Sequence, residues 1–225
     1  MNRIAVGILC GRGETDEALK VIQRVNGDSF VETILPLFPS RPVKCAGKFL
    51  FYPPAAANRR GAARNEIVKA LARLQGIDYG VILDDDTLPD PNYFEVISRL
   101  GKSEAPTMLT GKLRNVDGER SWDVCSFEDG NPVIVPYEFW EIEHHNKDLY
   151  FSGPQHIFNA AGLKLAAQVG YPDLTYGEDT QFCRQFRSAG GTLEPLLEIG
   201  AQLLHHHNSP NVTLYAVDWG LKRHL

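Results

Sequence analysis

Tyr79-Gly-Val-Ile-Leu-Asp-Asp-Asp-Thr-Leu-Pro-Asp-Pro-Asn-Tyr-Phe94 is the stretch of sequence on which the fold depends. Its short apolar run, Val81 to Leu83, predicts a buried strand. Pro89 and Pro91 each lack an N–H donor, so we do not expect the hydrogen-bonded ladder to continue beyond the acidic residues that follow this run. A strand that ends in carboxylates places them where open α/β sheets bind their ligands, outside the carboxyl ends of the strands.

Three adjacent carboxylates follow the apolar run, at Asp84, Asp85 and Asp86. Because side chains alternate across a strand, we expect Asp84 and Asp86 to point to one side and Asp85 to the other. Burying such a cluster unpaired is unfavourable, so water or a cation must neutralise it. Oxygen ligands of this kind suit Mg²⁺ or Mn²⁺. The alternative interpretation is a solvated acidic turn, with Asp90 capping the next helix.

Length and composition indicate one soluble α/β domain. The chain has 225 residues, 43% hydrophobic and 23% charged, which is enough for one sizeable core. A net charge of -5 and a pI near 5.8 give no overall electrostatic reason to bind nucleic acid or an anionic membrane. No signal peptide, membrane span or Cys-x-x-Cys spacing is evident, so we expect reduced, buried thiols and a cytoplasmic location.

Hydrophobic patterning predicts alternating strands and helices in the first half of the chain and hairpins after it. The expected strands cover residues 3–10, 30–35, 48–52, 81–83, 107–113, 122–127, 132–135 and 199–204. The expected helices cover residues 16–24, 58–74, 91–100, 159–169 and 178–189. We expect Pro36 to end the second strand.

Two short segments are candidates for binding an anion. Gly11-Arg-Gly13 lies between the first strand and the first helix, whose N-terminus offers free N–H groups, although a glycine turn also serves simply to reverse the chain. Arg59, Arg60 and Arg64 crowd the start of the second helix, where cations oppose the helix dipole and would suit an anionic ligand. The alternative for the arginines is a solvated basic helix end.

In their order along the chain, these motifs resemble a family-2-type glycosyltransferase with a GT-A fold. The resemblance spans roughly residues 58–207 and is carried by Arg64-Asn65, the Asp-x-Asp motif in Ile82-Leu-Asp-Asp-Asp86, Gly153, the Glu-Asp helix Gly177-Glu-Asp-Thr-Gln-Phe-Cys-Arg184 with Gly190-Gly191, and a strand ending in His205 to His207. It implies a single GT-A domain over residues 1–225, with a mixed central sheet and helices on both faces. A Rossmann-like nucleotide-sugar-binding half would cover about residues 1–100, and an acceptor and catalytic half about residues 101–225.

The resemblance also implies a reaction, in which a sugar moves from a nucleoside diphosphate sugar to an acceptor hydroxyl with Mn²⁺ or Mg²⁺ as cofactor. Asp86 would bind the metal, and a histidine late in the chain would complete the ligand set. On a strand His205 and His207 face the same way, so we favour that pair. The expected substrate-binding residues are Asp84, Arg64, Asn65, Gly11 and Gly153.

The Glu-Asp pair at the start of the 178–189 helix is the expected catalytic element. The acceptor hydroxyl loses its proton as the new bond forms, and in similar enzymes the aspartate of this pair is the general base. That role falls to Asp179, with Glu178 orienting the acceptor, and a base at this place implies inversion of the anomeric carbon. The alternative is that both acids only stabilise a helix N-terminus.

The sequence departs from the family pattern at three places, one of which is Gly11-Arg-Gly13 after the first strand, in place of the usual proline and asparagine turn. The second strand runs Ile34-Leu-Pro-Leu-Phe38 without the aspartate that reads the nucleotide base in many relatives, so the base stays open. The segment Gly170-Tyr-Pro-Asp-Leu-Thr-Tyr176 lacks the common Gly-Phe-Asp-Glu, which points to an unusual acceptor site.

Two rival functions and the acceptor stay open. A haloacid-dehalogenase-type phosphohydrolase would use Asp84 as a nucleophile with Asp86, but Leu88 stands where that family expects threonine or valine. A non-catalytic nucleotide-sugar-binding protein would not need Asp179. The acceptor could be a metabolite, an oligosaccharide or a hydroxyl on a macromolecule. A nucleic acid is not favoured, because the arginines suit the donor diphosphate.

Overall fold

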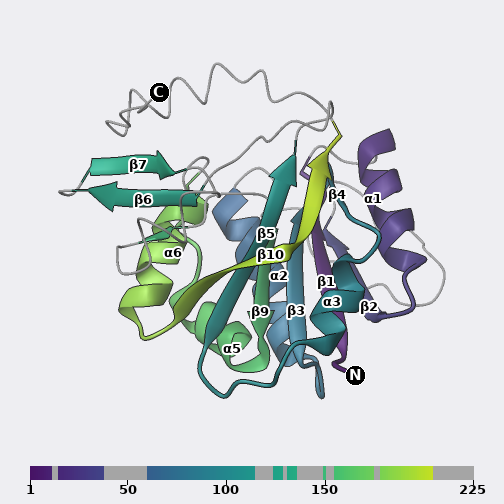
Figure 1. Cartoon of the computed structure of the whole chain (residues 1–225), viewed down its shortest axis with the longest axis horizontal. Helices are drawn as coiled ribbons and strands as arrows, with labels where there is room; N and C mark the ends of the chain where they lie inside the picture. The colour runs from purple at the N-terminus through teal and green to yellow at the C-terminus, as the bar shows by residue number, and fades with distance from the viewer. Residues whose placement is uncertain are drawn as a thin grey trace.

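A mixed seven-stranded sheet forms the centre of the molecule in the computed structural model (Figure 1). The structure describes residues 1–11, 15–37, 60–114, 124–128, 131–135, 149–150, 155–174 and 178–204. The strand order is β2-β1-β3-β9-β5-β10-β4. These strands are β1 (Ile4–Leu9), β2 (Val31–Leu37), β3 (Tyr79–Asp84), β4 (Thr87–Pro89), β5 (Thr107–Arg114), β9 (Gln155–Asn159) and β10 (Thr192–Leu203).

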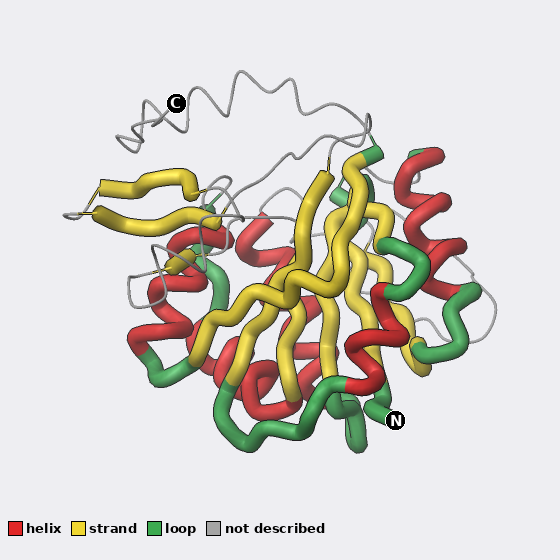
Figure 2. The backbone as a smooth tube through the Cα atoms, in the orientation of Figure 1, coloured by secondary structure: helices red, strands yellow, loops and turns green. Residues whose placement is uncertain are grey.

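Helices cover both faces of this sheet (Figure 2). They are α1 (Asp16–Asn26), α2 (Arg60–Arg73), α3 (Tyr93–Arg99), α5 (Ala160–Val169) and α6 (Glu178–Ser188). The buried side chains of α2, α5 and α6 form one core, and those of α1 and α3 form the other. This arrangement confirms the predicted α/β class with a mixed sheet and helices on both faces.

A second, three-stranded sheet of order β7-β6-β8 lies beside α6, which β8 contacts. Its strands are β6 (Val124–Glu128), β7 (Asn131–Val135) and β8 (Leu149–Tyr150). The antiparallel pairing of β6 with β7 confirms the hairpin expected in this part of the chain. The strand expected at residues 48–52 lies outside the described residues.

Strand alternation decides which helix each residue near the site can meet. On β3, Val81 and Leu83 belong to the core under α1 and α3, whereas Ile82 belongs to the core under α2, α5 and α6. Asp84 follows Ile82 by two positions and therefore falls on the α2 face. The strand thus delivers one carboxylate toward α2 at the end of the sheet where β1 and β3 both finish.

The expectation that Pro36 ends the second strand was wrong. β2 continues to Leu37, and Pro36 pairs with Ile8 of β1. β2 is the outer strand of the sheet, where half of the N–H groups face away from the ladder, so a proline removes no hydrogen bond that the sheet needs.

Strand β9 was not predicted, because its sequence Gln-His-Ile-Phe-Asn mixes polar and apolar residues without alternation. All five residues are buried, since β9 lies between β3 and β5. The side chain of Gln155 is hydrogen-bonded internally. The amide nitrogen of Gln155 donates to the carbonyls of Gly111 and Lys112, both at 2.9 Å, and its oxygen accepts from the Tyr93 hydroxyl at 2.8 Å.

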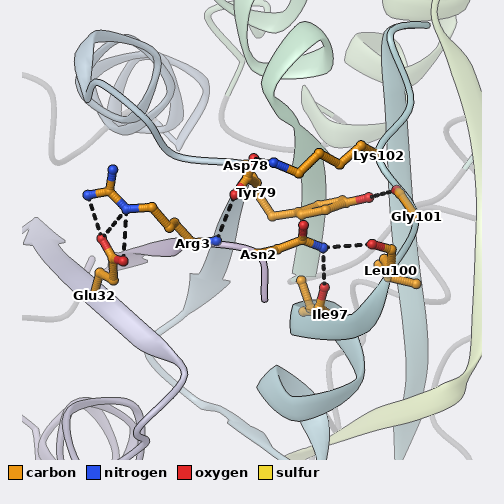
Figure 3. Close-up of polar contacts among 9 residues, drawn as sticks. All are labelled: Asn2, Arg3, Glu32, Asp78, Tyr79, Ile97, Leu100, Gly101 and Lys102. Carbon is orange, nitrogen blue, oxygen red and sulfur yellow. Dashed lines mark hydrogen bonds and ion pairs between the residues drawn. The ribbon is translucent and has the colours of Figure 1, made fainter.

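Polar contacts close the amino end of the sheet, opposite the acidic turn (Figure 3). The Asn2 side chain donates to the carbonyls of Ile97 at 3.1 Å and Leu100 at 2.8 Å, which ties β1 to the end of α3. The Tyr79 hydroxyl donates to the Gly101 carbonyl at 2.8 Å. None of the helices within the described residues has the length and apolar character that a bilayer span requires.

Candidate active site

The three aspartates form a turn at the carboxyl end of β3. β3 ends at Asp84, the turn consists of Asp85 and Asp86, and β4 begins at Thr87. The side-chain alternation expected along one strand therefore does not extend past Asp84. The Asp85 N–H donates to the Leu9 carbonyl at 3.2 Å, and the Thr87 hydroxyl donates to the Asp86 carboxylate at 3.3 Å. Asp85 and Asp86 are both buried.

The end of β10 lies against this acidic turn. β10 pairs with β4 through Leu203 and Thr87, and the N–H of Leu204 donates to the Asp86 carbonyl at 2.8 Å. The chain immediately before His205 therefore reaches Asp86. His205 and His207, as well as Gly153, lie outside the described residues. Within the described part of the chain, no three histidine, cysteine or acidic side chains gather closely enough to hold a metal ion.

Arg64 of α2 lies between two carboxylates that come from different elements. Its Nη2 donates to both oxygens of Asp84, at 3.0 and 3.2 Å, and its Nε lies 3.3 Å from Oε1 of Glu178 at the start of α6. Only 1% of Arg64 is exposed. The helical pattern explains this burial, because Arg64 shares a face of α2 with Val68 and Leu71, which are in the core.

Burial and charge shift the protonation of this group. Burial, aided by Asp86, raises the pKa of Asp84 to about 6 although Arg64 opposes the rise. Burial and the neighbouring Asp179 raise the pKa of Glu178 to about 7, again against Arg64. Burial alone would lower the pKa of Arg64, but Asp84 and Glu178 outweigh it and raise that pKa above its ordinary value. Arg64 is therefore a permanent cation.

The two acids that begin α6 have different surroundings. Glu178 is 2% exposed and its carboxylate faces Arg64, whereas Asp179 is half-buried. Asp179 therefore has surface that a bound acceptor could contact, and Glu178 is largely enclosed by the protein. The expected roles of both residues, base and orienter, remain predictions.

Asn65, next to Arg64, holds the backbone of Tyr171. Its amide nitrogen donates to the Tyr171 carbonyl at 2.8 Å, and its oxygen accepts from the Tyr171 N–H at 2.6 Å. Tyr171 is a residue that the sequence reasoning missed. Its ring stacks on Phe182 of α6 with centroids 3.8 Å apart, and its hydroxyl lies 2.5 Å from Nδ1 of the buried His156. The only sequence signal was the unusual segment in which Tyr171 lies.

Two of the remaining anion-binding candidates, Gly11 and Arg60, are exposed. Gly11 is exposed at the end of β1, and a Cβ added there would meet nothing within 4 Å, so crowding does not require glycine at this turn. Arg60 is exposed at the first position of α2, and its charge favours the ionised form of Asp84. Arg59 lies outside the described residues. Cys10 and Cys183 are buried free thiols, as expected.

Replacing Glu178 with glutamine is expected to change how stability depends on pH. A carboxyl whose pKa is raised on folding, from 4.5 to about 7, stabilises the fold below about pH 4.5 and loses that contribution as the pH rises through about 7. Wild-type protein in EDTA should therefore lose up to roughly 3 kcal/mol of unfolding free energy through this group between pH 4.5 and pH 8. Glu178→Gln should lack this part of the slope, as measured by urea unfolding at a series of pH values.

Glu198→Gln is the matched control, because Glu198 is an exposed glutamate on β10. Its pH profile should follow that of the wild type. Identical slopes for wild type and Glu178→Gln would contradict the raised pKa of Glu178.

Known proteins resemble this chain in structure but not detectably in sequence. No protein-family model matches the chain, and no curated protein matches it by sequence. Among solved structures, it is similar to GalNAc-T7 in complex with UDP, GalNAc and Mn²⁺ (TM-score 0.63, 10% identity, covering 96% of this chain and 48% of that one). It is also similar to residues 1–349 of TarS from S. aureus (TM-score 0.61, 11% identity, covering 90% and 60%). The chain thus spans about half to three-fifths of these proteins, and what it shares with them is a GT-A-like fold.

Proposed function

We propose that the chain is a metal-dependent glycosyltransferase that moves a sugar from a nucleoside diphosphate sugar to an acceptor hydroxyl. The observation that carries the proposal is the convergence of three elements at one edge of the sheet. They are the acidic turn of Asp84 to Asp86, the start of α6 with Asp179, and the end of β10 at Leu204. The similar fold of GalNAc-T7, which holds UDP, GalNAc and Mn²⁺, supports a nucleotide-sugar donor at this edge.

On the donor side, the residues fit a divalent cation and a diphosphate. The oxygen ligand Asp86 suits Mn²⁺ or Mg²⁺, and the chain leading to His205 reaches Asp86 through the Leu204 N–H. His205 and His207 would complete the ligand set, and the metal would supply Lewis-acid neutralisation of the departing diphosphate. Asp84 would orient the donor sugar or ribose. Gly11 and Arg60 lie exposed where the diphosphate would approach.

On the acceptor side, Asp179 would take the proton of the attacking hydroxyl. Asp179 lies in the first turn of α6 and is half-buried, so its carboxylate has surface that the acceptor hydroxyl could reach. Attack from the side opposite the leaving group inverts the anomeric carbon. In this proposal, residues 1–100 bind the nucleotide sugar, and the rest of the chain, with Gly153, binds the acceptor.

Two observations support sugar transfer over the phosphohydrolase alternative. The GT-A-like fold is one, and the engagement of Asp84 is the other. Both of its carboxylate oxygens accept hydrogen bonds from the buried Arg64, whereas a nucleophilic aspartate needs an oxygen free to attack phosphorus.

Titration of the protein with UDP, with and without Mn²⁺, tests the donor site directly. UDP is the first nucleotide to use because GalNAc-T7 holds it in a similar fold. We expect Mn²⁺ to tighten UDP binding by about tenfold or more, because Asp86 would hold the cation and its charge would neutralise the diphosphate. Asp86→Asn should bind UDP equally weakly with and without Mn²⁺. Isothermal titration calorimetry measures both affinities.

Asp85→Asn is the matched control, since it removes the adjacent carboxylate, to which no metal role is assigned, and should keep the Mn²⁺ effect. If wild type binds UDP with the same affinity in EDTA and in Mn²⁺, the proposed metal dependence is wrong. A parallel screen of nucleotide sugars for slow hydrolysis identifies the nucleotide base and the sugar of the donor. Metabolite, oligosaccharide and modified nucleic-acid acceptors can then be tested with that donor.

A further inference from the structure

The buried cation of Arg64 joins the two halves of the proposed active site. Asp84 ends β3 on the donor side, and Glu178 begins α6 on the acceptor side. Arg64 contacts both, through Nη2 at 3.0 Å and through Nε at 3.3 Å. These two carboxylates are distant in sequence, and one guanidinium brings their charges together.

Arg64 is not placed to bind a ligand by itself. It is 1% exposed, and its Nε and Nη1 are both buried without a hydrogen-bond partner among the described residues, so its contact with Glu178 is an ion pair. A planar guanidinium has donors on several edges, so it can serve two carboxylates at once. Arg64 can therefore affect a bound donor through its ion pair with Asp84, whose side chain is 18% exposed, and not by contacting a diphosphate itself.

The residues around Arg64 fix it in this bridging position. Its Cζ lies 5.8 Å from the centre of the Tyr171 ring, within the range of a cation–π contact. Tyr171 is in turn held by both backbone hydrogen bonds to Asn65 and stacks on Phe182 of α6. α2 thus holds α6 by two routes, an ion pair at Glu178 and an aromatic stack at Phe182.

We propose that Arg64 is a positioning residue that couples the donor carboxylate Asp84 to the start of α6, so that Glu178 influences donor binding without touching the donor. This inference rests on the proposed function and assigns Glu178 a role different from orienting the acceptor. Replacing Glu178 leaves Arg64 with Asp84 as its remaining ionic partner among the described residues. The strength and geometry of the Arg64–Asp84 pair then change, and the donor site changes with it.

A double-mutant cycle tests this coupling. UDP affinity in Mn²⁺ and the free energy of unfolding in EDTA are measured for wild type, Asp84→Asn, Glu178→Gln and the double variant. Without coupling the effects of the two substitutions on the dissociation constant multiply; with Arg64 between them, we expect a departure on the order of tenfold. In an Arg64→Lys background the departure should fall below about twofold, because an ammonium is a point charge without the planar fork.

Arg64→Lys retains the charge and is chosen so that the protein folds; Arg64→Met is measured as well where it folds. Arg3→Met is the control background, since Arg3 pairs with Glu32 at the opposite end of the sheet, and it should leave the coupling unchanged (Figure 3). If the effects of Asp84→Asn and Glu178→Gln on the dissociation constant for UDP multiply to within twofold when Arg64 is present, Arg64 does not have the positioning role. A wild type that does not bind UDP refutes the proposed donor, while the unfolding cycle in EDTA still decides whether Arg64 couples the two carboxylates.

Discussion

Asp179→Asn is expected to lower the rate of sugar transfer by about 10²- to 10⁴-fold, the range that a general base contributes. The physical reason is that asparagine keeps the size and polarity of the side chain but cannot accept the proton of the acceptor hydroxyl. Asp179 is half-buried at the first turn of α6, whereas Asp86 lies on the turn after β3. Donor affinity should therefore stay within about twofold of wild type. Transfer is measured as UDP release from the donor that the screen selects.

Asp173→Asn is the matched control, because Asp173 is an exposed aspartate in the segment before α6 and has no assigned role. Its transfer rate should equal that of the wild type. If Asp179→Asn loses donor affinity instead of rate, Asp179 is not the base. Proton NMR of the product should show an inverted anomeric configuration, and retention would exclude a mechanism of direct attack aided by Asp179.

Arg64→Met is expected to cost about 3–5 kcal/mol of unfolding free energy at pH 8, the effect of removing one member of a buried ion pair. Methionine fills much of the space but leaves Asp84 and Glu178 without their buried cation. Their pKa values, already raised, should rise further. A carboxyl with a raised pKa destabilises the fold where it is ionised, so the cost should shrink toward pH 5. Urea unfolding in EDTA at pH 5 and pH 8 measures both.

Arg114→Met is the matched control. Arg114 pairs with Asp90 in a similar arginine–aspartate contact, but 38% of its side chain is exposed, and exposed pairs contribute little. We expect a small loss of stability with little pH dependence. An Arg64→Met cost equal at both pH values would show that the two carboxyls are not the cause of the destabilisation.

The sequence predicted the parts of the fold that depend on local pattern. An apolar run followed by acids and prolines identified β3 and its turn, and the periodicity of α2 and the glycine pair after α6 identified those helices. The strand β9 was missed because the burial of Gln155 and Asn159 depends on neighbouring strands that supply hydrogen-bond partners. Such partners come from distant parts of the chain and leave no local signal.

The sequence named candidate site residues, but it did not predict the contacts that connect them in the structure. The Glu-Asp start of α6 and the aspartates after β3 were candidates because of their positions in the sequence, and the contacts of Arg64 with Asp84 and Glu178 bring the two elements together. That Arg64 joins Asp84 to Glu178 could not be read from a basic helix start, which resembles a solvated end. One signal was present, since Arg64 lies on the same helical face as Val68 and Leu71.

Among the described residues, both outer strands of the central sheet carry a proline, Pro36 on β2 and Pro89 on β4. A proline interrupts the row of donors that an incoming chain would use to extend a sheet, and β4 is only three residues long. These two edge strands thus resist edge-to-edge self-association, so the open sheet does not act as a template for aggregates of its own kind.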